Sequence, residues 1–123
     1  MKLHHVAVVA TSEEKSDRFY SGLLGLEKQR KREIPASLMN AIFQINRDTV
    51  MINYGNDALL VEVFIAAPSE ARTVSHLCLE APDRETLLET CEQMNIAVLR
   101  VPKDDGGYIA FIDDFDGNRF EIK

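Results

Sequence analysis

The chain has 123 residues, a length that fits one domain with a sizeable hydrophobic core. Hydrophobic residues make up 46% of the sequence and charged residues 28%, which excludes a disordered, collagen-like or low-complexity chain. No apolar run approaches the ~18 residues that a membrane span needs, so no membrane partner is expected. The net charge of −6 argues against a nucleic-acid partner, because neutralising phosphates requires a basic surface.

The cysteines and the N-terminus predict the cellular compartment. Cys78 and Cys91 both lie within apolar patterns, and two such residues do not make a disulfide framework. Residues 1–5 lack the long apolar stretch of a signal peptide. We therefore expect a cytoplasmic protein with buried, reduced thiols.

The first elements in chain order are a strand and a helix. Residues 3–10 form a compact, valine-rich run, which is typical of a strand buried on both faces. A capping-box pattern at residues 11–14 then predicts a helix over residues 12–24. Phe19 and Leu23, four residues apart, are expected to form the apolar side of this helix.

Extended segments dominate the rest of the first half. Pro35 and turns rich in Asn, Asp and Gly separate them. The apolar patterns predict strands over residues 26–34, 38–45, 49–54 and 59–66, followed by a connector at residues 67–70.

The second half begins with another apolar strand, predicted over residues 74–81. Asp83 is a good N-cap, and apolar residues recur after it at helical spacing, which predicts a helix. Three more strands are predicted over residues 96–101, 108–112 and 119–123, with a turn at residues 113–118.

The order of strand, helix and several strands thus occurs twice. His5 and His76 occupy equivalent places in the two opening strands. Each half is too small to bury its sheet alone, so the halves are expected to pack together. We therefore predict a single domain over residues 1–123, with internal repeats at about residues 1–68 and 69–123.

Two glutamates occupy unusual places in the apolar pattern. Glu62 stands in the middle of the apolar run at residues 59–65, and Glu121 lies between Phe120 and Ile122. A carboxylate in such a run is costly unless it is paired with a cation or bound to a metal ion. Each half therefore offers one such carboxylate near its end.

Each half also offers an imidazole near its start, from His5 and from His76. Two imidazoles and two carboxylates make a mixed donor set that suits Zn, Ni, Fe, Co or Mn. A six-coordinate ion would keep two positions for water or substrate. His4 competes with His5 for the first position, and strand alternation alone does not choose between them.

The strand expected at residues 26–34 carries a cluster of basic residues interleaved with glutamates. Such a cluster is typical of a solvated strand face, and it would also suit an anionic substrate tail or a phosphate. The candidates for binding an anionic substrate are Arg30, Arg32, Arg47, Arg100 and Lys103, and the sequence does not select among them.

Several segments together resemble a known superfamily. The most specific one places an acidic turn and Gly117-Asn118 before Glu121 and its apolar neighbours. The other segments that carry the resemblance are residues 3–9, 19–20, 24–26, 60–64, 74–77 and 109–112. On these residues the whole chain resembles the vicinal oxygen chelate superfamily, which includes glyoxalase I, methylmalonyl-CoA epimerase, extradiol dioxygenases, fosfomycin-resistance enzymes and bleomycin-binding proteins.

The resemblance implies an α+β fold of two βαβββ modules, whose curled mixed sheets form a shared metal-binding cavity. It implies that the divalent metal ion is bound by His5, Glu62, His76 and Glu121, and so it favours His5 over His4. This full set of four ligands resembles that of glyoxalase I.

The resemblance also implies an activity. The leading hypothesis is a metal-dependent lyase or isomerase of the glyoxalase/epimerase type, acting on a small substrate with neighbouring oxygens through an enediolate or enolate. Glu121 or Glu62 would be the general base. The alternatives are a non-catalytic drug-binding module of the bleomycin-resistance type and an Fe(II) extradiol-type dioxygenase. A homodimer is expected from the resemblance alone.

Overall fold

A computed structural model describes residues 1–113, 115 and 119–123, with residue 72 described by its backbone alone. The chain divides into two compact units, which we call unit 1 (Met1–His4 and His76–Lys123) and unit 2 (His5–Ser75). The turn expected at residues 113–118 falls largely outside the described residues. Within the described part of the chain, no helix is both long enough and apolar enough to cross a membrane.

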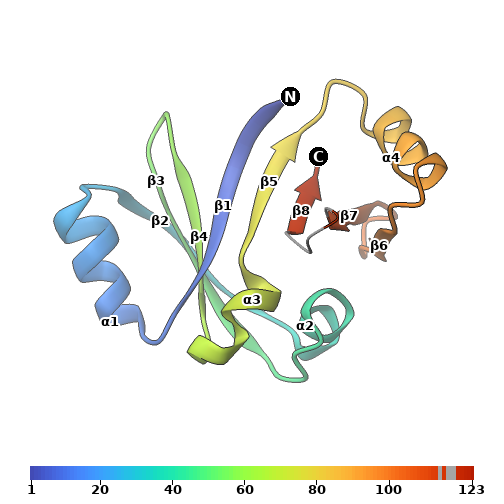
Figure 1. The fold of residues 1–123 in the computed structure, drawn as a ribbon. Helices are drawn as coiled ribbons and strands as arrows, with labels where there is room; N and C mark the ends of the chain where they lie inside the picture. The colour runs from blue at the N-terminus through green and yellow to red at the C-terminus, as the bar shows by residue number, and fades with distance from the viewer. Residues whose placement is uncertain (114, 116–118) are drawn as a thin grey trace. The chain divides into compact units, whose positions relative to one another are not determined.

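Unit 2 combines four strands with helices on the connections between them. Its strands follow the hydrogen-bonded order β2-β3-β4-β1, with β1 and β4 parallel and the other neighbours antiparallel. Figure 1 shows β2, β3 and β4 running beside β1, with α1 at the end of the connection that follows β1. The elements are β1 (Lys2–Ala10), α1 (Glu13–Ser16), η1 (Asp17–Leu23), β2 (Glu27–Ile34), α2 (Ala36–Phe43), β3 (Thr49–Gly55), β4 (Leu60–Ile65), η2 (Pro68–Glu70) and α3 (Ala71–Val74).

Unit 1 repeats the arrangement without the additional helices. Its strands follow the order β5-β8-β7-β6, with β5 and β8 parallel and the other neighbours antiparallel. The elements are β5 (His76–Glu80), α4 (Arg84–Gln93), β6 (Val98–Pro102), β7 (Tyr108–Asp113) and β8 (Arg119–Ile122). The predicted α+β class with a mixed sheet and the βαβββ order is thus confirmed, with α2 inserted in unit 2.

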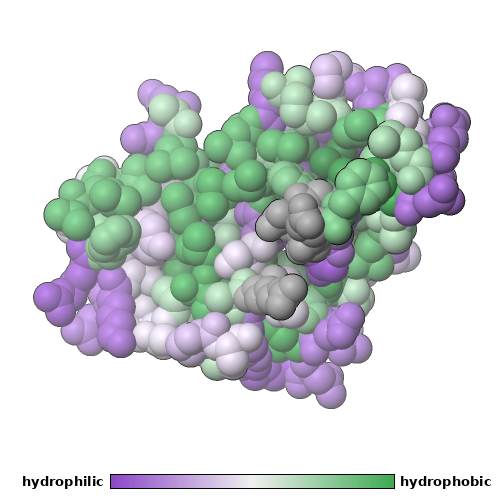
Figure 2. Space-filling model, in the orientation of Figure 1, coloured by the Kyte–Doolittle hydropathy of each residue, from purple (hydrophilic) through white to green (hydrophobic). Residues whose placement is uncertain are grey.

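The first helix forms where the sequence predicts it, but it presents a different face. Ser12 is its N-cap, and the Ser12 Oγ accepts a hydrogen bond from the Lys15 N–H at 3.2 Å. The helix then widens into the π-helix η1, which shifts the side chains out of the 3.6-residue period. Phe19 and Leu23 are consequently 49% and 70% exposed, and Figure 2 shows apolar side chains gathered over this part of the surface. Tyr20 packs inward instead and stacks on Tyr54, with 5.2 Å between ring centroids.

The prediction of a strand over residues 38–45 is wrong, because the helix α2 occupies this segment. Pro35 was expected to separate two strands, and it is instead the N-cap of this helix. A short apolar run fits both periods, and here the buried residues follow the helical spacing i, i+3, i+4. They are Met39, Ile42 and Phe43.

Each unit buries a hydrophobic cluster on one face of its strands. In unit 2 this cluster includes Leu26, Ile52, Tyr54, Val61 and Val63. In unit 1 it includes Leu88 from α4, Ala110 from β7 and Ile122 from β8. The opposite faces also carry buried apolar side chains, among them Met51 and Phe64 in unit 2 and Phe111 in unit 1. Because neighbours along a strand point to opposite faces, Glu62 and Glu121 lie on the faces away from these clusters.

Charged residues of α1 and η1 are tied to β2 by ion pairs. The Lys28 Nζ lies 2.6 Å from Glu13 Oε1 and 2.8 Å from Asp17 Oδ1. Lys31 Nζ contacts the other oxygen of Glu13 at 2.5 Å. Tyr54 donates a hydrogen bond from its hydroxyl to Asp17 Oδ1 at 2.6 Å. These contacts hold the pKa of both carboxyl groups below the usual range, chiefly through the hydrogen bonds from Lys28.

Removing this lysine is expected to weaken the fold in a pH-dependent way. A carboxyl group with a lowered pKa in the folded state adds stability that is present above its unfolded pKa and is lost as the pH falls through the folded pKa. Lys28→Gln is therefore expected to lower the urea midpoint at pH 7, modestly because the pairs are exposed. As the pH falls through the lowered pKa values of Glu13 and Asp17, the difference should shrink.

Arg32→Gln is the matched control, because Arg32 lies on the same strand without a carboxylate partner among the described residues. A loss of stability for Lys28→Gln that stays constant as the pH is lowered from 7 into the acid range would contradict the ion-pair explanation.

Candidate metal centre

In unit 2 the fold brings an imidazole and a carboxylate together. Ala7 of β1 is the register partner of Glu62 on β4, and His5 lies two residues before Ala7 on the same face. His5 is only 2% exposed. Its Nε2 lies 3.4 Å from Glu62 Oε2, and the glutamate side chain is 13% exposed. A buried imidazole thus has a mostly buried carboxylate as its neighbour.

Unit 1 builds the same pair from the equivalent strands. Cys78 of β5 is the register partner of Glu121 on β8, and His76 lies two residues before Cys78. His76 Nε2 lies 3.5 Å from Glu121 Oε2. The Phe111 and His76 rings lie nearly perpendicular to one another, with 5.1 Å between their centroids. Lys123 Nζ lies 3.8 Å from the other carboxylate oxygen of Glu121.

In each unit, therefore, one histidine and one glutamate of the four candidate ligands lie side by side. Imidazole nitrogen and carboxylate oxygen are donors for first-row divalent cations. The donor chemistry of both pairs thus fits a divalent metal ion, and the burial fits it as well, because a mostly buried carboxylate needs a cationic partner.

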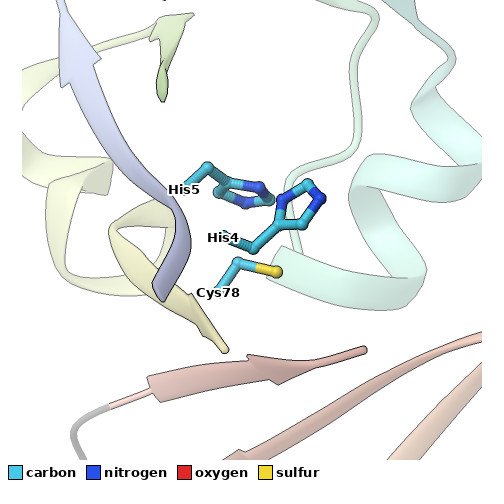
Figure 3. Close-up of side chains that lie close together, drawn as sticks. All are labelled: His4, His5 and Cys78. Atoms are coloured by element: carbon cyan, nitrogen blue, oxygen red, sulfur yellow. The ribbon is translucent and has the colours of Figure 1, made fainter. Parts of the chain in front are cut away.

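His4 and His5 have different surroundings, although the sequence left them as alternatives. His4 is exposed and belongs to unit 1, where its ring lies within 4.8 Å of Cys78 Sγ (Figure 3). Cys78 and Cys91 are both buried, as predicted, and neither belongs to a disulfide in the described part of the chain. His5 has the carboxylate of Glu62 beside its Nε2, which favours His5 as the ligand in the first half.

Asn53 is a polar residue on the same face that the sequence analysis missed. It is the antiparallel register partner of Glu62 across β3 and β4. Its Oδ1 is buried and has no hydrogen-bond partner among the residues that the structure describes. The signal was present in the sequence, since Asn53 interrupts an apolar strand between Ile52 and Tyr54, just as Glu62 interrupts its own.

Three of the five candidate cations are already paired with carboxylates. Arg47 donates two hydrogen bonds to Glu70, at 2.5 and 2.6 Å, which lower the pKa of Glu70 to about 2. Arg100 pairs with Glu92, and Lys103 pairs with Asp105.

The remaining two, Arg30 and Arg32, are exposed and have no carboxylate partner within the described part of the chain. In register they lie opposite Asn53 and Met51, on the same face of unit 2 as Glu62.

Taken together, the chain is an α+β protein with a repeated βαβββ order and a histidine–glutamate pair in each repeat. A family model described as the Glyoxalase/Bleomycin resistance protein/Dioxygenase superfamily matches residues 2–122. The chain belongs to this superfamily, which confirms the resemblance found in the sequence.

Solved structures share the fold at low sequence identity. A hypothetical protein from Bacillus halodurans C-125 superposes with a TM-score of 0.69 at 16% identity, covering 98% of this chain and 91% of the other. A variant of Streptomyces coelicolor methylmalonyl-CoA epimerase in complex with 2-nitronate-propionyl-CoA gives a TM-score of 0.66 at 13% identity, covering 99% and 95%. No curated protein sequence matches the chain.

Proposed function

We propose that this protein is a metal-dependent lyase or isomerase of the glyoxalase/epimerase type, acting on a small substrate with neighbouring oxygens. The observation that carries the proposal is the repetition of one geometry, with Nε2–Oε2 distances of 3.4 Å in unit 2 and 3.5 Å in unit 1. A single buried ion pair would be weak support. Two pairs at equivalent register positions, in a chain of this superfamily, support a shared chemical role.

The proposed ligands of the divalent cation are His5, Glu62, His76 and Glu121, and Ni, Zn, Fe, Co and Mn all suit this donor set. When bound, such an ion supplies positive charge that stabilises an enediolate or enolate oxygen of the substrate.

The general base in this proposal is Glu121 or Glu62. Both side chains are largely buried, at 12% and 13% exposure, so bulk water competes little for their oxygens. Each carboxylate can accept a proton from a substrate carbon while the adjacent imidazole holds its orientation. Lys123 contacts Oε1 of Glu121 and so leaves Oε2 on the side of His76.

Metal analysis tests the proposal directly. Protein purified without a chelator or a metal-affinity tag is expected to bind about one divalent ion per chain in a titration followed by dialysis. His5→Ala is expected to abolish retention, whereas His4→Ala, a change of the neighbouring residue, should leave it intact. Metal-free protein that gains nothing from added Ni or Zn would favour the non-catalytic binding module. Oxygen uptake with catechols would favour the dioxygenase.

The substrate can be approached through exchange of a carbon-bound proton. Methylmalonyl-CoA epimerases are among the solved structures with this fold, so methylmalonyl-CoA is the first compound to test. The metal-loaded protein is expected to exchange an acidic carbon-bound proton of its substrate with deuterium from the solvent.

The proposal also includes a homodimer and a cytoplasmic location. The dimer rests on the superfamily alone, and the location rests on the cysteines and the N-terminal residues of the sequence. Light scattering of the purified protein gives its mass and tests the dimer.

A further inference from the structure

The basic residues of β2 are sorted between the two faces of the strand. Register pairs Lys28 with Tyr54 and Lys31 with Ile52, on the face that carries the core, and Glu13 and Asp17 neutralise both lysines. A register shift between Lys28 and Arg30 then places Arg30 and Arg32 on the other face. The two arginines are therefore the basic residues of this strand that remain unneutralised among the described residues.

The arginines continue a polar row that starts at the proposed metal ligand. Across β1, β4, β3 and β2 the register aligns Ala7, Glu62, Asn53 and Arg30 on one face of unit 2. Neighbouring strands lie about 4.8 Å apart, so Asn53 is one strand spacing from Glu62, and Arg30 is about 10 Å away. The row thus presents a carboxylate, a buried amide oxygen that accepts no hydrogen bond from the described residues, and a guanidinium, in that order.

The equivalent row of unit 1 shows that the fold does not require this polarity. There the register aligns Cys78, Glu121, Phe111 and Leu99 across β5, β8, β7 and β6. The glutamate is the same, but an aromatic and an aliphatic side chain stand at the positions of Asn53 and Arg30. The amide and the guanidinium in this row are therefore found in unit 2 and not at the equivalent positions of unit 1, where the arginine on the face of Glu121, Arg119, is paired with Asp113.

We propose that this row selects an anionic substrate: Arg30 and Arg32 bind its negatively charged group, and Asn53 Oδ1 accepts a hydrogen bond from a donor between that group and the metal-binding oxygens. The inference rests on the proposed function, because it takes Glu62 as a ligand of the ion that binds the neighbouring oxygens. The substrate class is then a compound with two neighbouring oxygens at one end, a carboxylate or phosphate about 10 Å away, and an N–H or O–H group between them.

Three synthetic hydroxamates test this inference, because a hydroxamate supplies two neighbouring oxygens to a metal ion. N-succinylglycine hydroxamate has the chelating end, an amide N–H in the middle and a terminal carboxylate. Its methyl ester lacks only the charge. Pimelic acid monohydroxamate has the same chain length and charge but lacks the amide. Calorimetry with the nickel-loaded protein measures the three affinities.

The wild-type protein is expected to bind the acid about 10-fold more tightly than the ester, as a charge-assisted hydrogen bond allows. Substituting Gln for both Arg30 and Arg32 should remove this preference, and Lys31→Gln, on the opposite face, should keep it. Asn53→Leu should remove the preference for the amide compound over the pimelic compound. It should also raise the thermal midpoint of the free protein by about 3 °C, because a buried acceptor without a partner is lost.

Equal binding of acid and ester by the wild-type protein would overturn the inference and leave the proposed metal centre standing. Failure of all three compounds to bind in a metal-dependent way would overturn the proposed function, and the inference would fall with it. A lower thermal midpoint for Asn53→Leu would show that Asn53 serves the fold and would remove it from the substrate site.

Discussion

Glu121→Gln is expected to slow metal-dependent exchange of the substrate's carbon-bound proton by about 10²- to 10⁴-fold, the usual contribution of a general base. The amide keeps an oxygen at the same place and the shape of the side chain, but it cannot accept the proton. Exchange with deuterium, followed by NMR on the metal-loaded protein, measures this step without requiring a visible product. Metal content must be measured in parallel, so that a lost ligand is not mistaken for a lost base.

Glu62→Gln and Glu80→Gln complete this comparison. Glu80 is exposed at the end of β5, and its substitution should leave exchange unchanged. If Glu62→Gln slows exchange while Glu121→Gln retains the wild-type rate, the base belongs to unit 2. Wild-type rates in both variants would exclude either glutamate as the base.

Strand alternation accounts for much of what the sequence predicted. It placed His76 and Cys78 on one face of β5, and it isolated Glu62 in an apolar strand, where the structure puts the carboxylate beside an imidazole. Asp83 was recognised from local chemistry alone, and its side chain accepts a hydrogen bond from the Thr86 N–H at 3.1 Å. Features that depend on neighbours along the chain were thus readable.

Features that depend on pairing between strands were not readable from the sequence. Plain alternation puts Lys28 on one face with Arg30 and Arg32, whereas the register shift in β2 moves Lys28 to the face of Lys31. The carboxylates that neutralise Lys28 come from α1 and η1, and no spacing in the sequence predicts these ion pairs. The row from Glu62 to Arg30 likewise exists only once the register of four strands is known.

Helix geometry explains the remaining differences. The wider turn of η1 breaks the 3.6-residue period on which the inward placement of Phe19 and Leu23 depended. For α2, a run of eight residues is too short for periodicity to separate a helix from a strand, and Pro35 was compatible with both.

A saturating divalent ion is expected to stabilise the wild-type protein strongly, and single histidine variants should lose this effect. At an ion concentration 100 times the dissociation constant, binding to the folded state alone adds about 2.7 kcal/mol, or several degrees in the thermal midpoint. His5→Ala and His76→Ala should each abolish the shift if one ion needs ligands from both repeats. If each histidine–glutamate pair held its own ion, either variant would keep the part of the shift that belongs to the other pair. A thermal shift that survives both changes but disappears in His4→Ala would place the ion beside Cys78 instead. A ring nitrogen of His4 lies within 4.8 Å of Cys78 Sγ, so these two residues are an alternative pair of ligands.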